Sequence, residues 1–183
     1  MQPNLAADAR YDRATIALHW ATAALVVLAW MNAMVIDWFP EGPLRIDARS
    51  THIVLGSSLA CVVLIRLAWR ATWGRHLPVA DAGALGAVAK ASHWGLYTLL
   101  VTTLALGIFN AWVRGDDFFG WFSIPAFDAG NEALQGQAQD LHSLSANLLL
   151  VLAGLHACAA LWHRYWRRDA VFGRMLPGRS GER

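Results

Sequence analysis

The chain has 183 residues, of which 56% are hydrophobic and only 15% are charged. Soluble domains usually carry about 25% charged residues, so this composition excludes an ordinary soluble protein and indicates an integral membrane protein surrounded by lipid. Several long apolar segments in so short a chain leave no room for a second folded domain. No nucleic-acid partner is expected.

The N-terminal residues 1–14 are polar and lack the apolar core of a cleavable signal peptide. We therefore expect the first apolar segment to act as the insertion signal. The two cysteines, Cys61 and Cys158, fall within apolar segments. They are expected to be small core residues rather than partners in a disulfide.

Four apolar segments have the length of about 20 residues that a helix needs to span ~30 Å of hydrocarbon. They cover approximately residues 15–35, 51–69, 91–113 and 141–162. The links contain helix-breaking residues: Pro43 lies in the first, and Gly74 and Pro78 lie in the second. The third link is the longest and carries the aromatic run FFGWF at 118–122, which we expect at the membrane interface. The pattern predicts an all-α fold, an integral membrane four-helix bundle that forms one transmembrane domain over residues 1–183.

Lysine and arginine predict the orientation of this bundle. Of the 15 basic residues, 12 lie near the N-terminus, around the second link or near the C-terminus, and the other three are Arg45, Arg49 and Arg114. Because cytoplasmic loops carry the excess of basic residues, both termini are predicted to be cytoplasmic. The outer links also hold eight of the 13 acidic residues, so the outer surface is expected to be net negative.

The fourth apolar segment contains two histidines, His142 and His156, separated by 14 residues. At about 100° and 1.5 Å per residue, both imidazoles point in nearly the same direction, about 21 Å apart along the helix. Such a pair suits two metal centres stacked across a membrane. Intramembrane histidines also serve as hydrogen-bonding residues between helices, so the pair alone leaves both interpretations open.

The predicted orientation assigns a depth to the histidines of the other segments. His52 opens the second segment and shares the outer level with His142, so one pair of imidazoles is available there. His19, His93 and His156 share the inner level, and two further histidines, His76 and His163, lie closer to the surface. The inner level therefore has more candidates than a single bis-histidine site needs, and spacing does not choose among them.

Paired imidazoles on opposite helices favour an axially ligated haem iron. Structural zinc usually has four ligands, commonly with cysteine, and no such set converges in the sequence. A proton relay would need buried carboxylates, which the four segments almost lack. The absence of a CxxCH motif argues against covalent c-type attachment. Gly56 and Gly154 lie near the histidines, where small residues either admit a flat macrocycle or simply serve helix packing.

Several local motifs resemble the bacterial cytochrome b561 family. They are Tyr11-x-Arg13, Ala17-Leu-His-Trp20, His52-x-x-x-Gly56 with Arg66 and Arg70, Ser92-His93, and Leu155-His156-Ala157-x-Ala159 with His163. The resemblance runs from about Tyr11 to Pro177, most of the chain. The same four-helix plan resembles the b-type cytochrome subunits of membrane-bound nickel-iron hydrogenases and formate dehydrogenases.

The resemblance implies a multi-pass protein of the bacterial inner membrane with two b-type haems held between the helices. By position, His52 and His142 would ligate the outer haem iron, and His19 and His156 the inner one. His93 would then be unliganded and would hydrogen-bond a haem propionate or a neighbouring helix, with His163 as a rival inner ligand. Arginine suits propionates because its planar fork matches a carboxylate. This assigns Arg13, Arg66 and Arg70 to the inner haem and Arg49 to the outer one, although each also serves as a positive-inside or snorkelling residue.

The implied function is transmembrane electron transfer between an outer donor and ubiquinone or another quinone. Some members of the family oxidise periplasmic superoxide, so a superoxide:quinone oxidoreductase is one hypothesis. The donor could equally be a periplasmic redox protein. In a second interpretation the chain is the haem-bearing membrane anchor of a separate dehydrogenase or hydrogenase. A third, a haem-free bundle, is disfavoured by four histidines at two matched depths.

Overall fold

The computed structural model describes residues 10–78, 83–128 and 130–177. Within them, four helices are long and apolar enough to cross a membrane. They are α1 (Arg13–Ile36), α2 (Pro43–Thr72), α3 (Gly83–Arg114) and α4 (Glu132–Trp162). The four-helix membrane bundle predicted from hydropathy is therefore confirmed.

All four helices extend beyond their predicted apolar segments, because hydropathy marks only the lipid-spanning part of a helix. The largest differences lie at the starts of α2, α3 and α4, which each begin eight or nine residues before the predicted boundary. Pro43, which the sequence suggested as an interruption, is instead the first residue of α2. Proline suits this position, since the N–H that it lacks would have no partner within the helix.

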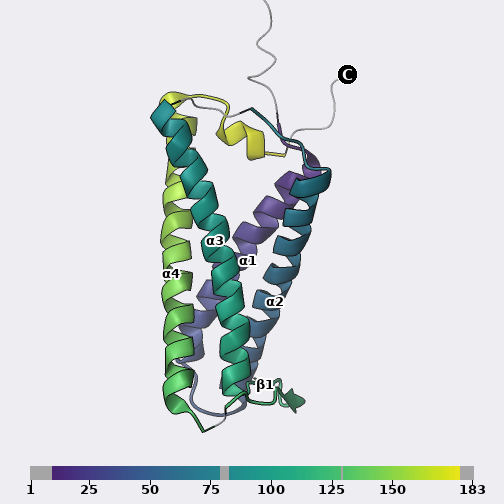
Figure 1. Ribbon diagram of the computed structural model, residues 1–183, viewed down its shortest axis with the longest axis vertical. Coiled ribbons are helices and arrows are strands. Elements are labelled where there is room, and N and C mark those ends of the chain that lie inside the picture. Colours follow the sequence, from purple (N-terminus) through teal and green to yellow (C-terminus); the bar gives the residue numbers. More distant parts are fainter. Residues whose placement is uncertain (1–9, 79–82, 129, 178–183) are drawn as a thin grey trace, which may run out of the picture.

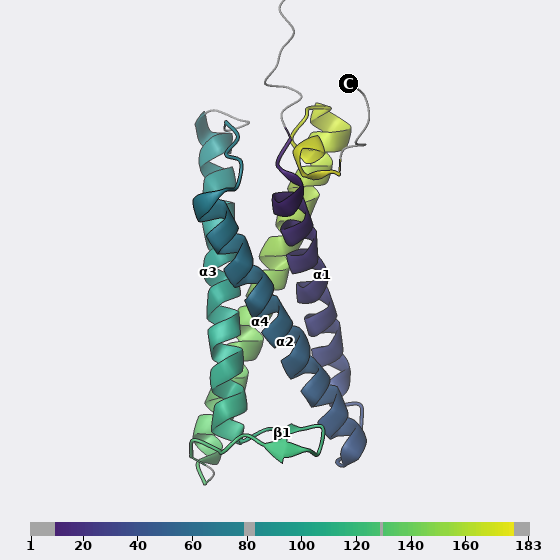
Figure 2. The ribbon, with the colours of Figure 1, turned by 90° about the vertical axis from the view of Figure 1, so that its right-hand side faces the viewer.

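The bundle consists of two helical hairpins. α1 packs along α2 and α3 packs along α4, whereas few contacts join one pair to the other. Figure 1 shows the four helices along the long axis, and Figure 2 shows α2 inclined across the bundle. One direct link between the hairpins is the hydrogen bond from Trp30 Nε1 to Asn147 Oδ1 (3.2 Å). The two hairpins are therefore joined less closely to each other than the two helices within each hairpin.

The buried core lies halfway along the bundle. Leu59 and Val63 of α2 pack with Leu100 of α3 and Leu149 of α4. On α4, Leu149 stands midway between His142 and His156, so this apolar cluster separates the two histidine levels. The two cysteines are free, as expected, but they are exposed rather than in the core. The expectation that they are core residues was wrong because the side of a spanning helix that faces lipid is as apolar as the core.

The two ends of the bundle are closed in different ways. At the lower end in Figure 1, the α3–α4 link forms a small antiparallel hairpin of β1 (Asp117–Phe118) and β2 (Phe122–Ser123). We call this the outer end, following the predicted orientation. At the opposite, inner end, α4 continues into a π-helix (η1, His163–Arg167) and a 3-10 helix (η2, Phe172–Met175).

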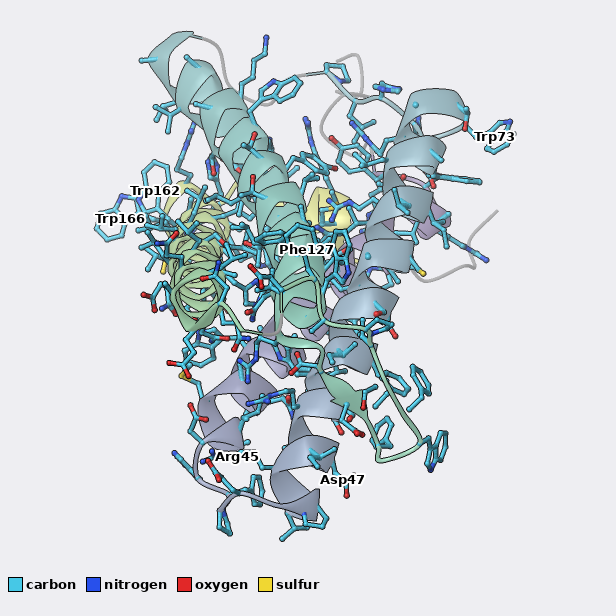
Figure 3. The ribbon with its side chains drawn as sticks, turned by 60° about the horizontal axis from the view of Figure 1, so that its bottom comes forward. Arg45, Asp47, Trp73, Phe127, Trp162 and Trp166 are labelled. Carbon is cyan, nitrogen blue, oxygen red and sulfur yellow. The ribbon has the colours of Figure 1, made fainter. Side chains whose placement is uncertain are left out.

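The inner end is joined by hydrogen bonds between distant parts of the chain. Tyr11 N–H donates to the carbonyl of Arg174 (3.2 Å), and Trp20 Nε1 donates to the carbonyl of Met175 (2.8 Å). The start of α1 therefore lies beside η2, so both ends of the described chain are on the same side of the bundle. Figure 3 shows Trp162 and Trp166 pointing away from α4, and Trp166 is 81% exposed. This is the arrangement expected of interfacial anchors.

Candidate haem-binding sites

The outer histidines, His52 of α2 and His142 of α4, meet across the boundary between the two hairpins. Their ring centroids are 6.0 Å apart and their planes are nearly perpendicular, at 83°. A metal–imidazole bond is about 2 Å long, and a ring nitrogen lies about 1 Å from the ring centre. The separation is therefore close to that of two imidazoles sharing one iron.

Each outer imidazole is fixed by a backbone carbonyl of its own hairpin. His52 Nδ1 lies 3.0 Å from the carbonyl oxygen of Ala29 on α1, and His142 Nδ1 lies 3.1 Å from that of Thr103 on α3. Since a carbonyl only accepts, both Nδ1 atoms carry the proton and both Nε2 atoms have a free lone pair. A histidine metal ligand is commonly oriented in this way. The outer residues therefore fit an axially ligated haem.

The two glycines that the sequence singled out differ in their surroundings. Gly56 follows His52 by one helical turn, and a Cβ added to it would meet no atom within 4 Å. Helix packing therefore does not account for Gly56, and the space beside it is open to a flat group. Gly154 also has open space around it, but it is exposed and lies about 200° around α4 from His156. It therefore faces away from the histidine.

The inner level brings three histidines and one arginine together. His93 and His156 have ring centroids 5.3 Å apart. His19 interacts electrostatically with both of them and with Arg66. Arg66 Nη2 lies 3.2 Å from His19 Nδ1. Because arginine only donates, His19 Nδ1 accepts this hydrogen bond and its proton is on Nε2. Unlike the outer pair, His19 is not in the tautomer that offers Nε2 to a metal.

The inner donor set nevertheless fits a haem. The buried Nε atom of Arg66 has no hydrogen-bond partner among the described residues. A buried donor without an acceptor is costly, and a propionate of a haem would satisfy it. His93 and His156 belong to α3 and α4, which pack directly together, whereas His19, which interacts electrostatically with His156, belongs to the other hairpin. As at the outer level, imidazoles of both hairpins are therefore present at the inner level.

The other residues expected at the inner end have partners of their own. Arg70 stacks over the ring of Tyr11 (5.4 Å), and its Nη1 donates to the carbonyl of Arg75. Arg13 is the exposed first residue of α1. His163 Nδ1 lies 2.6 Å from a carboxylate oxygen of Asp169. Burial alone would raise the pKa of Asp169, but hydrogen bonds from His163 and the Val171 N–H outweigh it and lower that pKa.

Arginines from α2 and α3 lie together at the outer end, an arrangement that the sequence does not show. Arg49, one turn before His52, lies 3.4 Å from the carboxylate of Asp116, and Arg114 lies 3.5 Å from the same oxygen. Asp116 is only 8% exposed, and this burial raises its pKa although both arginines oppose the rise. An open cavity of about 350 Å³ adjoins this cluster and is lined by Glu41, Gly42, Arg45, Ile46, Arg49 and Arg114.

Spacing in the sequence missed several residues that hold His142. Thr103 supplies the carbonyl, and Thr103 Oγ1 donates to Ser145 Oγ (3.1 Å), which itself donates to the carbonyl of His142 (2.9 Å). Gly107 lies against the ring of His142. A helical wheel could have placed Gly107 on the side of α3 that carries Thr103, since the two are four residues apart. It could not have shown that this side faces His142.

A membrane bundle that holds paired imidazoles between two helical hairpins is the architecture of a b-type cytochrome that transfers electrons within a membrane. Comparison with known families agrees: a sequence model of the prokaryotic cytochrome b561 family matches residues 10–178. The chain belongs to this family. It is accordingly a multi-pass bacterial membrane protein with an electron-transfer role, and the family implies haem b.

Three relatives resemble the chain over almost its whole length. "Probable superoxide oxidase CybB" of Yersinia pestis is 26% identical over 175 residues, which cover 94% of this chain and 98% of the relative. "Cytochrome b561 homolog 1" of Escherichia coli K12 is 28% identical, with coverage of 93% and 99%. "Cytochrome b562" of Cereibacter sphaeroides is 28% identical, with coverage of 92% and 96%.

Proposed function

We propose that this protein is a diheme b-type cytochrome that carries electrons from superoxide at the outer end to a quinone at the inner end. Its single transmembrane domain lies in the inner membrane with both termini in the cytoplasm. His52 and His142 hold the outer haem, and His19 and His156 hold the inner one. Each bound haem supplies a one-electron carrier. The observation that carries the proposal is the outer pair, whose Nδ1 atoms are both bonded to carbonyls.

At the inner level, the proposed assignment requires Arg66 to exchange partners. With a propionate as acceptor, Arg66 no longer needs the lone pair of His19 Nδ1, and the ring is free to place its proton there. Arg66 also stacks over the ring of Tyr97 (5.5 Å), which holds the guanidinium at this level. His93 stays unliganded beside His156. We propose that the quinone head group binds on the side of the inner haem where His93 and Arg70 lie. Arg13, at the start of α1, remains a candidate partner for a haem propionate.

The cavity at the outer end favours a small anionic donor. Three arginines and one glutamate line it, and Arg49 connects it to His52 along one turn of α2. A cavity lined mainly by one sign of charge raises the local concentration of the opposite ion. The name of the Yersinia pestis relative supports superoxide as that ion. Two superoxide ions would give two molecules of dioxygen and two electrons, and one quinone would take up these electrons with two protons to form a quinol.

The test is superoxide-dependent quinone reduction by the purified protein. We expect quinol to form only when superoxide, ubiquinone and haem-loaded protein are all present, and superoxide dismutase to abolish the reaction. Arg49→Gln should slow the reaction several-fold at low salt. Absence of activity in a native preparation with two haems would reject superoxide as the donor. Co-purification of a stable dehydrogenase or hydrogenase partner would then favour the anchor-subunit alternative.

A further inference from the structure

We propose that Gly107 is a positioning residue for the outer haem, because the missing side chain lets the His142 ring reach the backbone carbonyl of Thr103 and so sets the tautomer and strength of this ligand. The inference rests on the proposed function, in which His142 ligates the outer iron.

The first observation is the space at Gly107. A Cβ built on this residue would lie 2.9 Å from Cε1 of His142 and 3.4 Å from its Nδ1. Carbon atoms pack at about 3.5–4.0 Å, so a methyl group would need the ring to move. The atoms in conflict belong to a ring held between two helices rather than to the end of a flexible side chain. Any residue larger than glycine therefore displaces this imidazole.

The second observation is the relation of Gly107 to Thr103. In an α-helix, the N–H of residue 107 pairs with the carbonyl of residue 103, and the side chain of a residue covers the turn before it. A side chain at position 107 would therefore cover the carbonyl that accepts the hydrogen bond from His142 Nδ1 (3.1 Å). The Thr103–Ser145 hydrogen bond links α3 to α4 at the same level and keeps this carbonyl opposite the ring.

The other outer ligand makes the same type of hydrogen bond beside a different residue. His52 Nδ1 bonds to the carbonyl of Ala29, and the residue four positions later on α1 is Ala33. A Cβ is compatible with the hydrogen bond on α1, so the need for glycine at position 107 comes from the closer approach of the His142 ring to α3. An imidazole that donates Nδ1–H to such a carbonyl is a more basic ligand, which favours the oxidised metal. Losing this hydrogen bond should therefore raise the reduction potential of the outer haem.

The experiment is a redox titration with haem quantitation of native protein, Gly107→Ala and a matched control, Gly95→Ala. Gly95 lies twelve residues earlier on α3, and a Cβ there would meet only the flexible end of Leu152, at 3.0 Å. We expect Gly107→Ala to lose the outer haem or to raise its potential, while the inner haem is unchanged and serves as an internal reference. We expect Gly95→Ala to keep both potentials.

Unchanged content and potential of both haems in Gly107→Ala would overturn the inference, as would an equal change in Gly95→Ala. If Gly107→Ala fails to assemble at all, Ser145→Ala decides the question. It removes the link between Thr103 and α4 without adding volume, and it should raise the outer potential by a smaller amount. An unchanged outer potential in Ser145→Ala would then refute the inference. A native preparation without an outer haem would instead refute the proposed function.

Discussion

The outer and inner levels both contain histidines, but the imidazoles of the two levels have different hydrogen-bond partners. At the outer level, both imidazoles are bonded through Nδ1 to helix carbonyls and leave Nε2 free. At the inner level, His19 accepts from Arg66, and His156 is closest to His93. Backbone carbonyls hold a ring whether or not a metal is present, whereas a guanidinium takes whichever acceptor is available. In the proposed function, the outer ligands would thus be oriented before haem binds, whereas the inner ligands would become oriented when it binds.

The largest expected effect separates the two levels. His142→Ala should lose the outer haem and keep the inner one, and His156→Ala should do the reverse. The reason is that each variant would lose one of the two side chains that would hold the haem at its level. Haem quantitation and reduced-minus-oxidised spectra of the purified variants measure this outcome. A native protein with only one haem would contradict the assignment of one haem to each histidine level.

The second prediction addresses the surplus of histidines at the inner level. His19→Ala should lose the inner haem, whereas His93→Ala should retain both haems and slow quinone reduction, because His93 lies in the same packed hairpin as His156. The same spectra, combined with quinol assays, distinguish the two variants. If His93→Ala loses a haem while His19→Ala keeps both, the ligand pair is His93–His156, and the boundary between the hairpins does not define the inner site.

The sequence predicted the arrangement of helices better than the orientation of their side chains. Apolar length was sufficient for the four helices, and the 14-residue interval between His142 and His156 was sufficient for two levels. Periodicity does not reveal which carbonyl a ring approaches, because this depends on how neighbouring helices are rotated. Thr103, Gly107 and Ser145 were missed for this reason. The convergence of Arg45, Arg49 and Arg114 likewise depends on how the outer ends of α2 and α3 approach each other, which hydropathy does not encode.

The third prediction concerns the charge of Asp116, which lies between Arg49 and Arg114 at the outer end. Asp116→Asn should raise the rate of superoxide-dependent reduction about two- to ten-fold at low ionic strength, because it removes a negative charge beside a cavity that attracts anions. The difference should fade at high salt, where charges are screened over roughly 3 Å. Stopped-flow spectroscopy over a range of salt concentrations measures it.

Asp117→Asn is the matched control for this prediction. It removes the same charge from the next residue, but the Asp117 carboxylate accepts from Gly120 N–H (2.6 Å) and Ser123 Oγ (3.1 Å) within the β1–β2 hairpin. The Asp117 carboxylate therefore does not neutralise the arginines, and Asp117→Asn should change the rate of reduction less than Asp116→Asn does. Equal rates in both variants and the native protein would indicate that the arginine-lined cavity does not guide the donor.

The smallest expected effect concerns Asp12, which holds the inner ends of α1 and α2 together. Its carboxylate accepts from the Thr15 N–H (2.8 Å), from Thr15 Oγ1 (2.6 Å), from Trp69 Nε1 (2.9 Å) and from the Arg75 N–H (3.0 Å). Removing a helix cap costs about 1–2 kcal/mol, so Asp12→Ala should lower the free energy of unfolding by this amount. Asn131→Ala, which removes a cap with a single such bond to Leu134 at the outer end, should cost less.

The dependence on pH provides a separate test of the Asp12 network. Burial tends to raise the pKa of Asp12, but the hydrogen bonds from Thr15, Arg75 and Trp69 outweigh it and lower that pKa far below its usual range. A carboxylate with a lowered folded-state pKa stabilises the protein above its unfolded pKa of about 3.9, and this stability is lost as the pH falls towards the folded-state value. Thermal unfolding in detergent between pH 7 and pH 3 should therefore show a difference between native protein and Asp12→Ala that shrinks below about pH 4. A constant difference would mean that Asp12 acts through packing, and that charge plays no part in holding the inner end.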